Sequence, residues 1–317
     1  KEVGDAVTYV FNRNINFTNV CNNFCKFCAF SKPESSPGAY TLSKKQVSEK
    51  VRKAVDRGAT EICFQGGINP KLDFEDYLDY LRAIREVSEK VHIHAYSPSE
   101  IHHMKKKSGL DIEEVLKILK DEGLNSVPGT AAEILVDRVR KIICPNRISA
   151  KRWEEIIRMC HKLGIPTSAT LMYGHVETPR EIAIHLNKIR EIQKDTGGFT
   201  ELVPLAFASE NTQLQKEGLV KDLGPEYHLK IHAVSRLMLS GWIRNIQTSW
   251  VKLGPELAKR TLNAGANDFS GTLMEENITG AAGGKFNRLE PEEIRKLISE
   301  KGKIPVERTT TYNHVKK

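Results

Sequence analysis

The sequence contains no long hydrophobic run and few cysteines. No stretch of about eighteen apolar residues, the length that spans a bilayer, occurs in its 317 residues, and no secretory signal pattern opens it. Six cysteines in a chain of this length exclude a disulfide scaffold, and three of them, Cys63, Cys144 and Cys160, stand singly in apolar or helical surroundings. With 39% hydrophobic and 28% charged residues, the sequence predicts a soluble cytoplasmic protein with no membrane partner.

The sequence also lacks the concentrated positive charge of a nucleic-acid-binding domain. Its 48 Lys and Arg against 40 Asp and Glu give a net charge of +8, which could attract nucleic acid. However, basic and acidic residues are mixed along the expected helices, and the densest basic run, residues 102–107, is short. We therefore expect a solvated surface and no nucleic-acid partner.

Segments rich in β-branched residues alternate with segments of helical period along most of the chain. Eight such β/α units without a change in composition predict a single (β/α)8 barrel of the TIM type over residues 1–302. A polar tail, residues 303–317, follows as an extended or frayed segment. The expected strands are 14–17, 61–65, 91–96, 125–127, 167–173, 200–205, 243–247 and 268–273. The expected helices are 44–57, 74–87, 98–107, 112–122, 131–142, 150–163, 179–194, 225–240, 255–263 and 291–301.

Three cysteines lie within eight residues, close behind the first expected strand. Cys21, Cys25 and Cys28 offer three thiolates, whereas a closed zinc site needs four ligands, and no fourth Cys or His follows at a suitable distance. A 4Fe–4S cluster held by three thiolates keeps one iron open for another ligand. Barrels of this kind place their chemistry at the carboxyl ends of strands, where these cysteines fall. A zinc knuckle or three unrelated thiols is the alternative.

The Cys-x3-Cys-x2-Cys spacing, with Phe27 before the last cysteine, resembles the signature of the radical SAM superfamily. The resemblance implies a 4Fe–4S cluster on Cys21, Cys25 and Cys28, with S-adenosylmethionine (SAM) on the open iron and Phe27 beside the cofactor. It also implies an external electron donor and a 5′-deoxyadenosyl radical that attacks the substrate. Because the cofactor performs the difficult chemistry, we predict no catalytic residue beyond the cluster ligands.

The end of the second expected strand resembles a stretch that holds SAM in this superfamily. Gln65, Gly66 and Gly67 lie there, and the glycines let the backbone approach a ligand closely. Many members carry a Glu directly after the two glycines, but this chain has Ile68, so any contact would come from backbone oxygens. A plain tight turn is the alternative.

Two later stretches resemble further SAM-binding parts of the superfamily. Glu133 and Arg152 match residues that hold the ribose or amino group and the carboxylate of SAM in relatives such as biotin synthase. For each of them, a surface ion pair is the alternative. Tyr173 precedes a glycine that resembles the turn on the adenine side of the cofactor.

Polar residues near other strand ends could bind a substrate. His94 and Tyr96 share one face of the third expected strand, His175 follows the fifth, and Gln247 and Thr248 follow the seventh. The third strand carries a His-x-His pair, which suggests a metal, but no third ligand at a suitable spacing is apparent. We therefore expect hydrogen bonds to a substrate, or ordinary packing, from these residues.

Longer strings narrow the resemblance to a small group of radical SAM enzymes, over about residues 11–285. The group contains the two subunits of the deazaflavin (FO) synthase of coenzyme F420 biosynthesis and two enzymes of futalosine-dependent menaquinone synthesis. Pro-Gly-Thr-Ala-Ala-Glu at 128–133 and Asn-Ile-Gln-Thr-Ser-Trp at 245–250 are similar to the tyrosine-using subunit of FO synthase. In a third string, Ser270 departs from the glycine of that subunit.

This resemblance implies a transferase that cleaves the Cα–Cβ bond of L-tyrosine. It would transfer the 4-hydroxybenzyl group to 5-amino-6-(D-ribitylamino)uracil and release 2-iminoacetate, and a second radical SAM subunit would be its functional partner. The alternative within the group is aminofutalosine synthase or dehypoxanthine futalosine cyclase. A more distant alternative is a metal-binding nucleic-acid module, which the absence of a second cysteine pair opposes.

Overall fold

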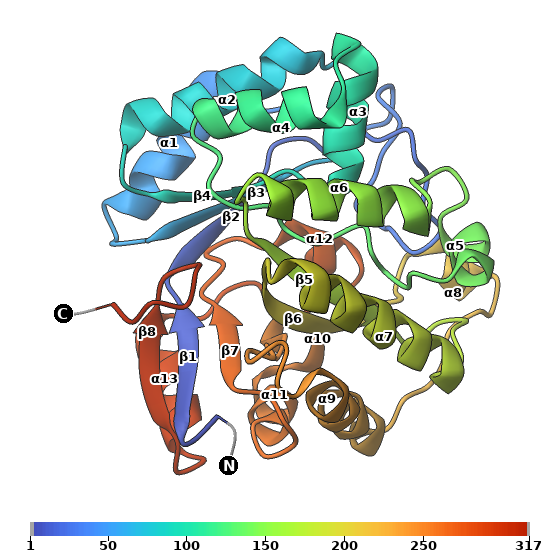
Figure 1. The fold of residues 1–317 in the computed structure, drawn as a ribbon, viewed down its shortest axis with the longest axis vertical. Helices are drawn as coiled ribbons and strands as arrows, with labels where there is room; N and C mark the ends of the chain where they lie inside the picture. Colours follow the sequence, from blue (N-terminus) through green and yellow to red (C-terminus); the bar gives the residue numbers. More distant parts are fainter. Residues whose placement is uncertain (1–2, 316–317) are drawn as a thin grey trace.

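Parallel strands covered by helices form the α/β fold of the computed structural model, which describes residues 3–315 (Figure 1). Every pairing between two of its named strands is parallel. The strands are β1 (Ala6–Val10), β2 (Asn12–Asn16), β3 (Glu61–Gln65), β4 (His92–Ala95), β5 (Thr167–Tyr173), β6 (Phe199–Ala206), β7 (Asp268–Gly271) and β8 (Ile304–Arg308). The helices are α1 (Lys44–Val55), α2 (Phe74–Val87), α3 (Pro98–Ser108), α4 (Ile112–Asp121), α5 (Asp137–Ile143), α6 (Ala150–Lys162), α7 (Pro179–Thr196), α8 (Gln213–Lys216), α9 (Pro225–Leu239), α10 (Trp250–Leu253), α11 (Pro255–Thr261), α12 (Asn277–Ala281) and α13 (Pro291–Ser299).

Strand pairing runs through three sheets, ordered β2-β3-β4, β5-β6 and β7-β1-β8. Single parallel bridges join them, because Ser126 and Val127 lie between β4 and β5, and Ile246 and Gln247 lie between β6 and β7. Only residue 11 separates β1 from β2. Pairing therefore continues from β2 through β7 and back to β1.

The expected strands at 61–65 and 167–173 are confirmed as β3 and β5 with the same bounds. Those at 125–127 and 243–247 shrink to single bridges. Side-chain amides replace some of the backbone hydrogen bonds between strands there. Asn125 Oδ1 accepts from the Ile93 N–H at 2.8 Å, and Asn267 Oδ1 accepts from the Ile246 N–H at 2.9 Å. Local side-chain hydrogen bonds of this kind compete with regular strand pairing.

Two strands near the chain ends go beyond the expected set. β1 precedes the first expected strand, and its Ala-Val-Thr-Tyr-Val sequence is rich in β-branched residues. β8 falls in the predicted tail and pairs with β1 in register, from Ala6 opposite Ile304 to Val10 opposite Arg308. The tail is therefore extended at β8 rather than frayed.

The prediction of a helix at 131–142 is wrong in its first half, because α5 begins only at Asp137. Ala131 and Glu133 have left-handed backbone conformations, with φ of 68° and 44°, which end any regular helix at these residues. Inside this loop, the guanidinium of buried Arg140 donates to the carbonyl oxygens of Ala131 (3.1 Å) and Ala132 (2.6 Å). The Ala-Ala-Glu-Ile-Leu sequence has a high intrinsic helix propensity, so tertiary contacts determine the backbone conformation of this loop.

The alternation of side chains along each strand separates the interior of the fold from the helix layer. In β5, Ser168, Thr170 and Met172 line an internal cavity, whereas Leu171 and Tyr173 pack in the core shared with the surrounding helices. Among the described helices, none is long and apolar enough to cross a membrane.

Candidate functional site

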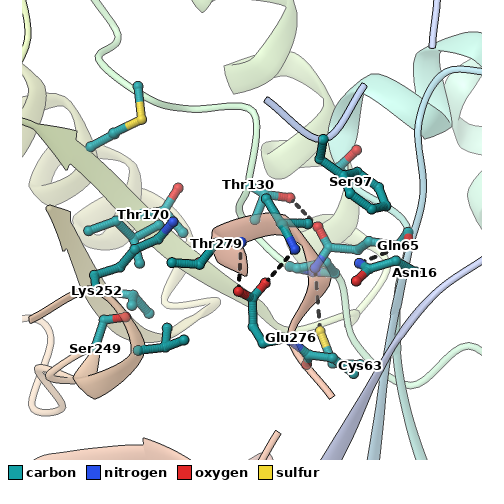
Figure 2. A pocket seen from close by; sticks show the side chains of 18 of the residues that line it. Asn16, Cys63, Gln65, Ser97, Thr130, Thr170, Ser249, Lys252, Glu276 and Thr279 are labelled. Carbon is teal, nitrogen blue, oxygen red and sulfur yellow. Dashed lines mark hydrogen bonds between the residues drawn. The ribbon is translucent and has the colours of Figure 1, made fainter. Parts of the chain in front are cut away.

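A cavity of about 370 Å³ lies inside the strands and extends to the loops that follow their carboxyl ends. Asn16, Gln65 and Met172, near the ends of β2, β3 and β5, all line it. Figure 2 shows part of the lining, where the Thr130 hydroxyl donates to Gln65 Oε1 at 2.7 Å. The carboxyl edge of parallel strands is the usual place for a ligand site.

The three predicted cluster ligands lie on one wall of this cavity. Cys21, Cys25 and Cys28 all line it and form no disulfide. Backbone hydrogen bonds hold their loop: the Cys28 N–H donates to the Cys25 carbonyl at 3.0 Å, and the Lys26 N–H donates to the Ile143 carbonyl at 2.8 Å. We call this surface, with Phe27, Glu133 and Arg147, the cysteine wall.

The chemistry of these thiols fits a bound metal cluster. Burial raises the pKa of Cys21 and of Cys25, although the positive charge of Arg147 opposes both shifts. Without a metal these thiols stay protonated at neutral pH, and a coordinated metal would remove their protons. Within residues 3–315, no three His, Cys, Asp or Glu side chains are grouped around a single metal ion. A 4Fe–4S cluster instead takes each thiolate on a different iron.

Gly66 and Gly67 lie against the loop that carries the cysteines. A Cβ on Gly66 would meet the Phe17 ring at 2.7 Å, and one on Gly67 would meet the Val20 carbonyl oxygen at 2.3 Å. Both contacts are too short for a real Cβ, so these positions need glycine for packing within the protein, and the predicted approach to a ligand stays a prediction. Gln65 and both glycines also line the cavity, so their backbone atoms can contact a cofactor bound there.

Glu100 on α3 fixes the turn at Gly66, a contact that sequence reasoning missed. Its side chain accepts from the Gly66 N–H at 3.0 Å and from the Ser97 N–H at 2.7 Å. Burial raises the pKa of Glu100 to about 7, although hydrogen bonds from Ser97 and Gly66 oppose the shift. The capping-box pattern Ser97-x-x-Glu100 is visible in the sequence, but the long-range contact to Gly66 is not.

Glu133 lines the cavity, but its partner is Arg147 and not Arg152. The Arg147 guanidinium forms an ion pair with Glu133 and lies 5.7 Å from the centre of the Phe27 ring. Burial alone would lower the pKa of Arg147, but Glu133 and Cys25 raise it overall. Arg147 is therefore a charged member of the cysteine wall.

Arg152 lies outside the cavity, which corrects its predicted place at the cofactor. It pairs with Glu155 at 2.7 Å on α6, and both side chains are about two-fifths exposed. Ser149 caps α6 and fixes Arg152 in its first turn, where it faces solvent. The prediction rested on spacing within the family, and spacing does not reveal that the loop before α6 carries the nearer arginine. In the sequence, Pro145-Asn146 before Arg147 indicates a turn at this place.

Tyr173 and His175 do not line the cavity. Tyr173 points away from it, and its hydroxyl lies 2.8 Å from His228 Nδ1. His175 is buried, with Nδ1 3.1 Å from a Glu177 carboxylate oxygen. Because side chains alternate along β5, it is Met172 that faces the cavity. The predicted adenine-side and substrate roles of these two residues therefore lack direct access.

Tyr96 and Thr248 are also buried away from the cavity lining. Tyr96 has a left-handed φ of 60°, which breaks the strand alternation, and its hydroxyl donates to the Tyr77 carbonyl at 2.6 Å. The predicted contact of both residues with a substrate is therefore corrected to packing.

His94 and Gln247 do line the cavity. With Glu61, Glu201 and Arg308 they form a surface that we call the charged floor. His94 Nδ1 lies 2.6 Å from the Ser126 hydroxyl, and Gln247 Nε2 donates to Glu201 at 3.1 Å. Burial lowers the pKa of His94, so this histidine is neutral near pH 7.

Arg308 is the centre of the charged floor, and sequence reasoning missed it. From the end of β8 it donates to Asp268 at 2.5 Å and reaches Glu201 at 3.4 Å. The Tyr312 ring lies 4.0 Å from its guanidinium carbon, and the Tyr312 hydroxyl donates to Glu201. Burial raises the pKa of Glu201 to about 7, with Arg308 opposing the shift. Nothing local in the tail sequence signals that these two residues enter the core.

Solved structures with similar folds support the fold class. The chain matches methylornithine synthase with a TM-score of 0.73 at 19% identity, over 95% of this chain and 84% of that one. It matches the FeFe-hydrogenase maturase HydG from Carboxydothermus hydrogenoformans with a TM-score of 0.73 at 16% identity, over 98% and 70%. At these identities the likeness shows the fold alone, which is a TIM-type α/β architecture.

Sequence comparisons give the family. Residues 15–189 match the Radical SAM superfamily, and residues 196–317 match the CofH/MqnC C-terminal region. The chain is 51% identical to 5-amino-6-(D-ribitylamino)uracil–L-tyrosine 4-hydroxyphenyl transferase of Methanopyrus kandleri, over 100% of this chain and 86% of that protein. It is 49% identical to the protein of the same name from Archaeoglobus fulgidus, over 98% and 89%. The chain belongs to the radical SAM superfamily and, within it, to the family of these transferases.

Proposed function

We propose that this protein is a radical SAM transferase that cleaves L-tyrosine between Cα and Cβ and transfers the 4-hydroxybenzyl group to 5-amino-6-(D-ribitylamino)uracil. Relatives of about half identity over the full length carry the name of this reaction. The single structural observation that carries the proposal is that three free cysteines share one cavity with a polar, charged floor. The futalosine-pathway alternative has no such relatives among those compared above.

We infer that Cys21, Cys25 and Cys28 hold the 4Fe–4S cluster. Phe27, Gln65, Gly66, Gly67 and Glu133 line the same cavity and are proposed to hold SAM, with Arg147 in place of Arg152. When bound, the cluster and SAM together supply the electron and the 5′-deoxyadenosyl radical that start the reaction.

The residues of the cavity bind the two substrates, orient them and shield the reacting atoms from water. Its depth within the strands keeps bulk water from the reacting atoms, and fixed polar groups hold the two substrates in one orientation. His94 and Gln247 on the charged floor offer hydrogen bonds suited to the uracil or the ribityl chain. No acid–base step is assigned to them.

We also propose that the strands close into one (β/α)8 barrel. Its eight members would be β1 with β2, β3, β4, residues 125–127, β5, β6, residues 245–247 and β7. Support comes from the uninterrupted parallel pairing and from the Asn14 N–H, which donates to the Leu273 carbonyl at 2.8 Å beyond β7. The division into a barrel, 1–302, and a tail, 303–317, stays a prediction.

We also propose two functional partners, an electron donor and a second enzyme. The chemistry requires an external one-electron donor, and product transfer to a second radical SAM subunit of FO synthase fits the proposed reaction. A cytoplasmic location suits the six unpaired cysteines.

Product analysis by mass spectrometry tests the function. After anaerobic iron–sulfur reconstitution, the protein is incubated with dithionite, SAM, L-tyrosine and the ribitylaminouracil. We expect 5′-deoxyadenosine together with a uracil adduct heavier by a hydroxybenzyl unit. Deoxyadenosine without adduct would redirect the assignment to the futalosine substrates, and neither product from protein with an intact cluster would overturn the substrate assignment.

A further inference from the structure

Lys252 is a cavity residue with no role in the site described above. It lies on α10, directly after the seventh strand segment, and lines the cavity with Ser249. Figure 2 shows Lys252 and Ser249 on one side of the cavity, and Gln65 and Thr130 on another. The lysine therefore faces the same space as the cysteine wall.

The amine of Lys252 stands apart from the other cations of the cavity. Within residues 3–315, its Nζ takes part in no ion pair and no side-chain hydrogen bond. The two arginines that line the cavity differ, because Arg147 pairs with Glu133 and Arg308 pairs with Asp268 and Glu201. Lys252 is thus the lining cation whose charge the described residues leave unpaired.

The two carboxylates that act electrostatically on Lys252 form hydrogen bonds or ion pairs with other groups. Glu133 holds Arg147, and Glu276 accepts from the N–H groups of Ile278 (3.1 Å) and Thr279 (2.7 Å) at the start of α12. Burial lowers the pKa of Lys252, while Glu276, Cys28 and Glu133 oppose that shift without pairing with it. An enclosed cation without a partner is costly, and a bound anion would offset that cost.

We infer that Lys252 receives the carboxylate of an amino acid bound in the cavity, and we assign that carboxylate to L-tyrosine. The inference rests on the proposed function, which brings two amino-acid groups into one cavity, those of tyrosine and of SAM. Arg147 already lies on the cysteine wall, where SAM is proposed to bind. Lys252 comes from a different strand end and offers three N–H donors to the second carboxylate.

Binding of tyrosine and tyramine, measured by equilibrium dialysis on the reconstituted protein without reductant, tests the assignment. Tyramine is tyrosine without its carboxylate. Wild-type protein should bind tyrosine more tightly than tyramine, and K252M should weaken tyrosine binding by about 30-fold while leaving tyramine binding unchanged. K252R should keep part of the preference, because it keeps the positive charge.

Lys117→Met is the matched control, since Lys117 lies on the exposed face of α4 and pairs with Glu113. This variant should bind both ligands as the wild type does. Thermal unfolding of K252M must stay close to that of the wild type, which separates lost binding from lost folding. K252M that keeps the full preference for tyrosine would overturn the inference.

A second readout separates the two possible carboxylates. Addition of SAM should perturb the electron paramagnetic resonance spectrum of the reduced cluster equally in wild type and K252M. If K252M loses this response but keeps its preference for tyrosine, the tyrosine assignment is overturned and the lysine serves SAM. Failure of the proposed function is distinct, because wild-type protein would then form no adduct in the product assay.

Discussion

The cysteine wall and the charged floor line one cavity but differ in how their polar groups are paired. The wall presents three free thiols, with Cys25 buried and Cys21 and Cys28 half-buried, so its chemistry is completed by a bound ligand. The floor satisfies its own charges, since Arg308 pairs with Asp268 and Glu201, and Asn12 donates to Glu61 at 2.8 Å. The thiols of the wall therefore await the cofactor, whereas the paired charges of the floor stabilise the fold and shape the part of the cavity in which His94 and Gln247 are proposed to contact a substrate. Variants in the two regions should fail in different ways.

The largest expected effect is on the wall. Cys25→Ala should abolish cluster binding and activity, because two thiolates remain where three are needed. Its thermal stability without metal should stay close to that of the wild type, since the loop is held by backbone hydrogen bonds. Iron and sulfide content after anaerobic reconstitution measures the first effect. Cys160→Ala, a cysteine in the core away from the cavity, should keep its cluster, and full activity in a variant lacking all three wall cysteines would refute the assignment.

The next largest effect is on the floor. Arg308→Met should lower the free energy of unfolding by about 3–5 kcal/mol, because it leaves Asp268 and Glu201 as buried carboxylates without their cation. Urea or thermal unfolding measures the change. Arg57→Met is the control, since Arg57 pairs with Glu290 on the surface and should cost at most about 1 kcal/mol. If both variants lose the same free energy of unfolding, the buried ion pairs of Arg308 contribute no more to stability than a surface ion pair.

The same contrast explains what the sequence predicts. The wall follows from one contiguous motif, Cys21 to Cys28, because ligands of one cluster must lie close together in space and here they also lie close in the chain. The β/α alternation likewise predicts β3 and β5 to the residue, since each strand contains β-branched and aromatic residues of its own.

The floor does not follow from the sequence, because its contacts join residues far apart in the chain. Arg308 reaches Glu201 over a separation of 107 residues, and Thr8 donates to Asp268 over 260. The sequence also fails to predict the loops of the wall. Ala131 and Glu133 are left-handed where a helix is expected, and Arg147, in the loop before α6, lines the cavity in place of Arg152. Backbone conformation in such loops depends on tertiary contacts that periodicity does not encode.

A pH-dependent effect sharpens the comparison at Glu100, which supports the wall through Gly66. Its carboxyl group releases its proton near 4.5 in the unfolded chain and near 7 in the folded protein. The folded state therefore binds more protons between these values, and the free energy of unfolding falls as the pH rises from about 5 to 7, by up to about 3 kcal/mol from this residue.

Glu100→Gln should flatten this fall, because the amide does not titrate. Urea unfolding at several pH values measures the slope. Glu114→Gln is a matched control, since Glu114 occupies the same capping-box position on α4 but is exposed, and it should keep the wild-type slope. A slope that Glu100→Gln leaves unchanged would place the pH dependence elsewhere, with Glu201 as the next residue to substitute.

The smallest effects separate the two arginines. Arg147→Met should weaken SAM binding to the reconstituted protein by about 10-fold, because it removes the cation of the wall, whereas Arg152→Met should change it by less than about 2-fold. Equilibrium dialysis with labelled SAM, at matched cluster content, measures both. The reverse pattern would restore the residue that family spacing favours and would mean that the loop before α6 rearranges when the cofactor binds. Equal, small effects would mean that Glu133 needs no cation to hold SAM, and that Arg147 serves only to neutralise Glu133 beside the thiols of the wall.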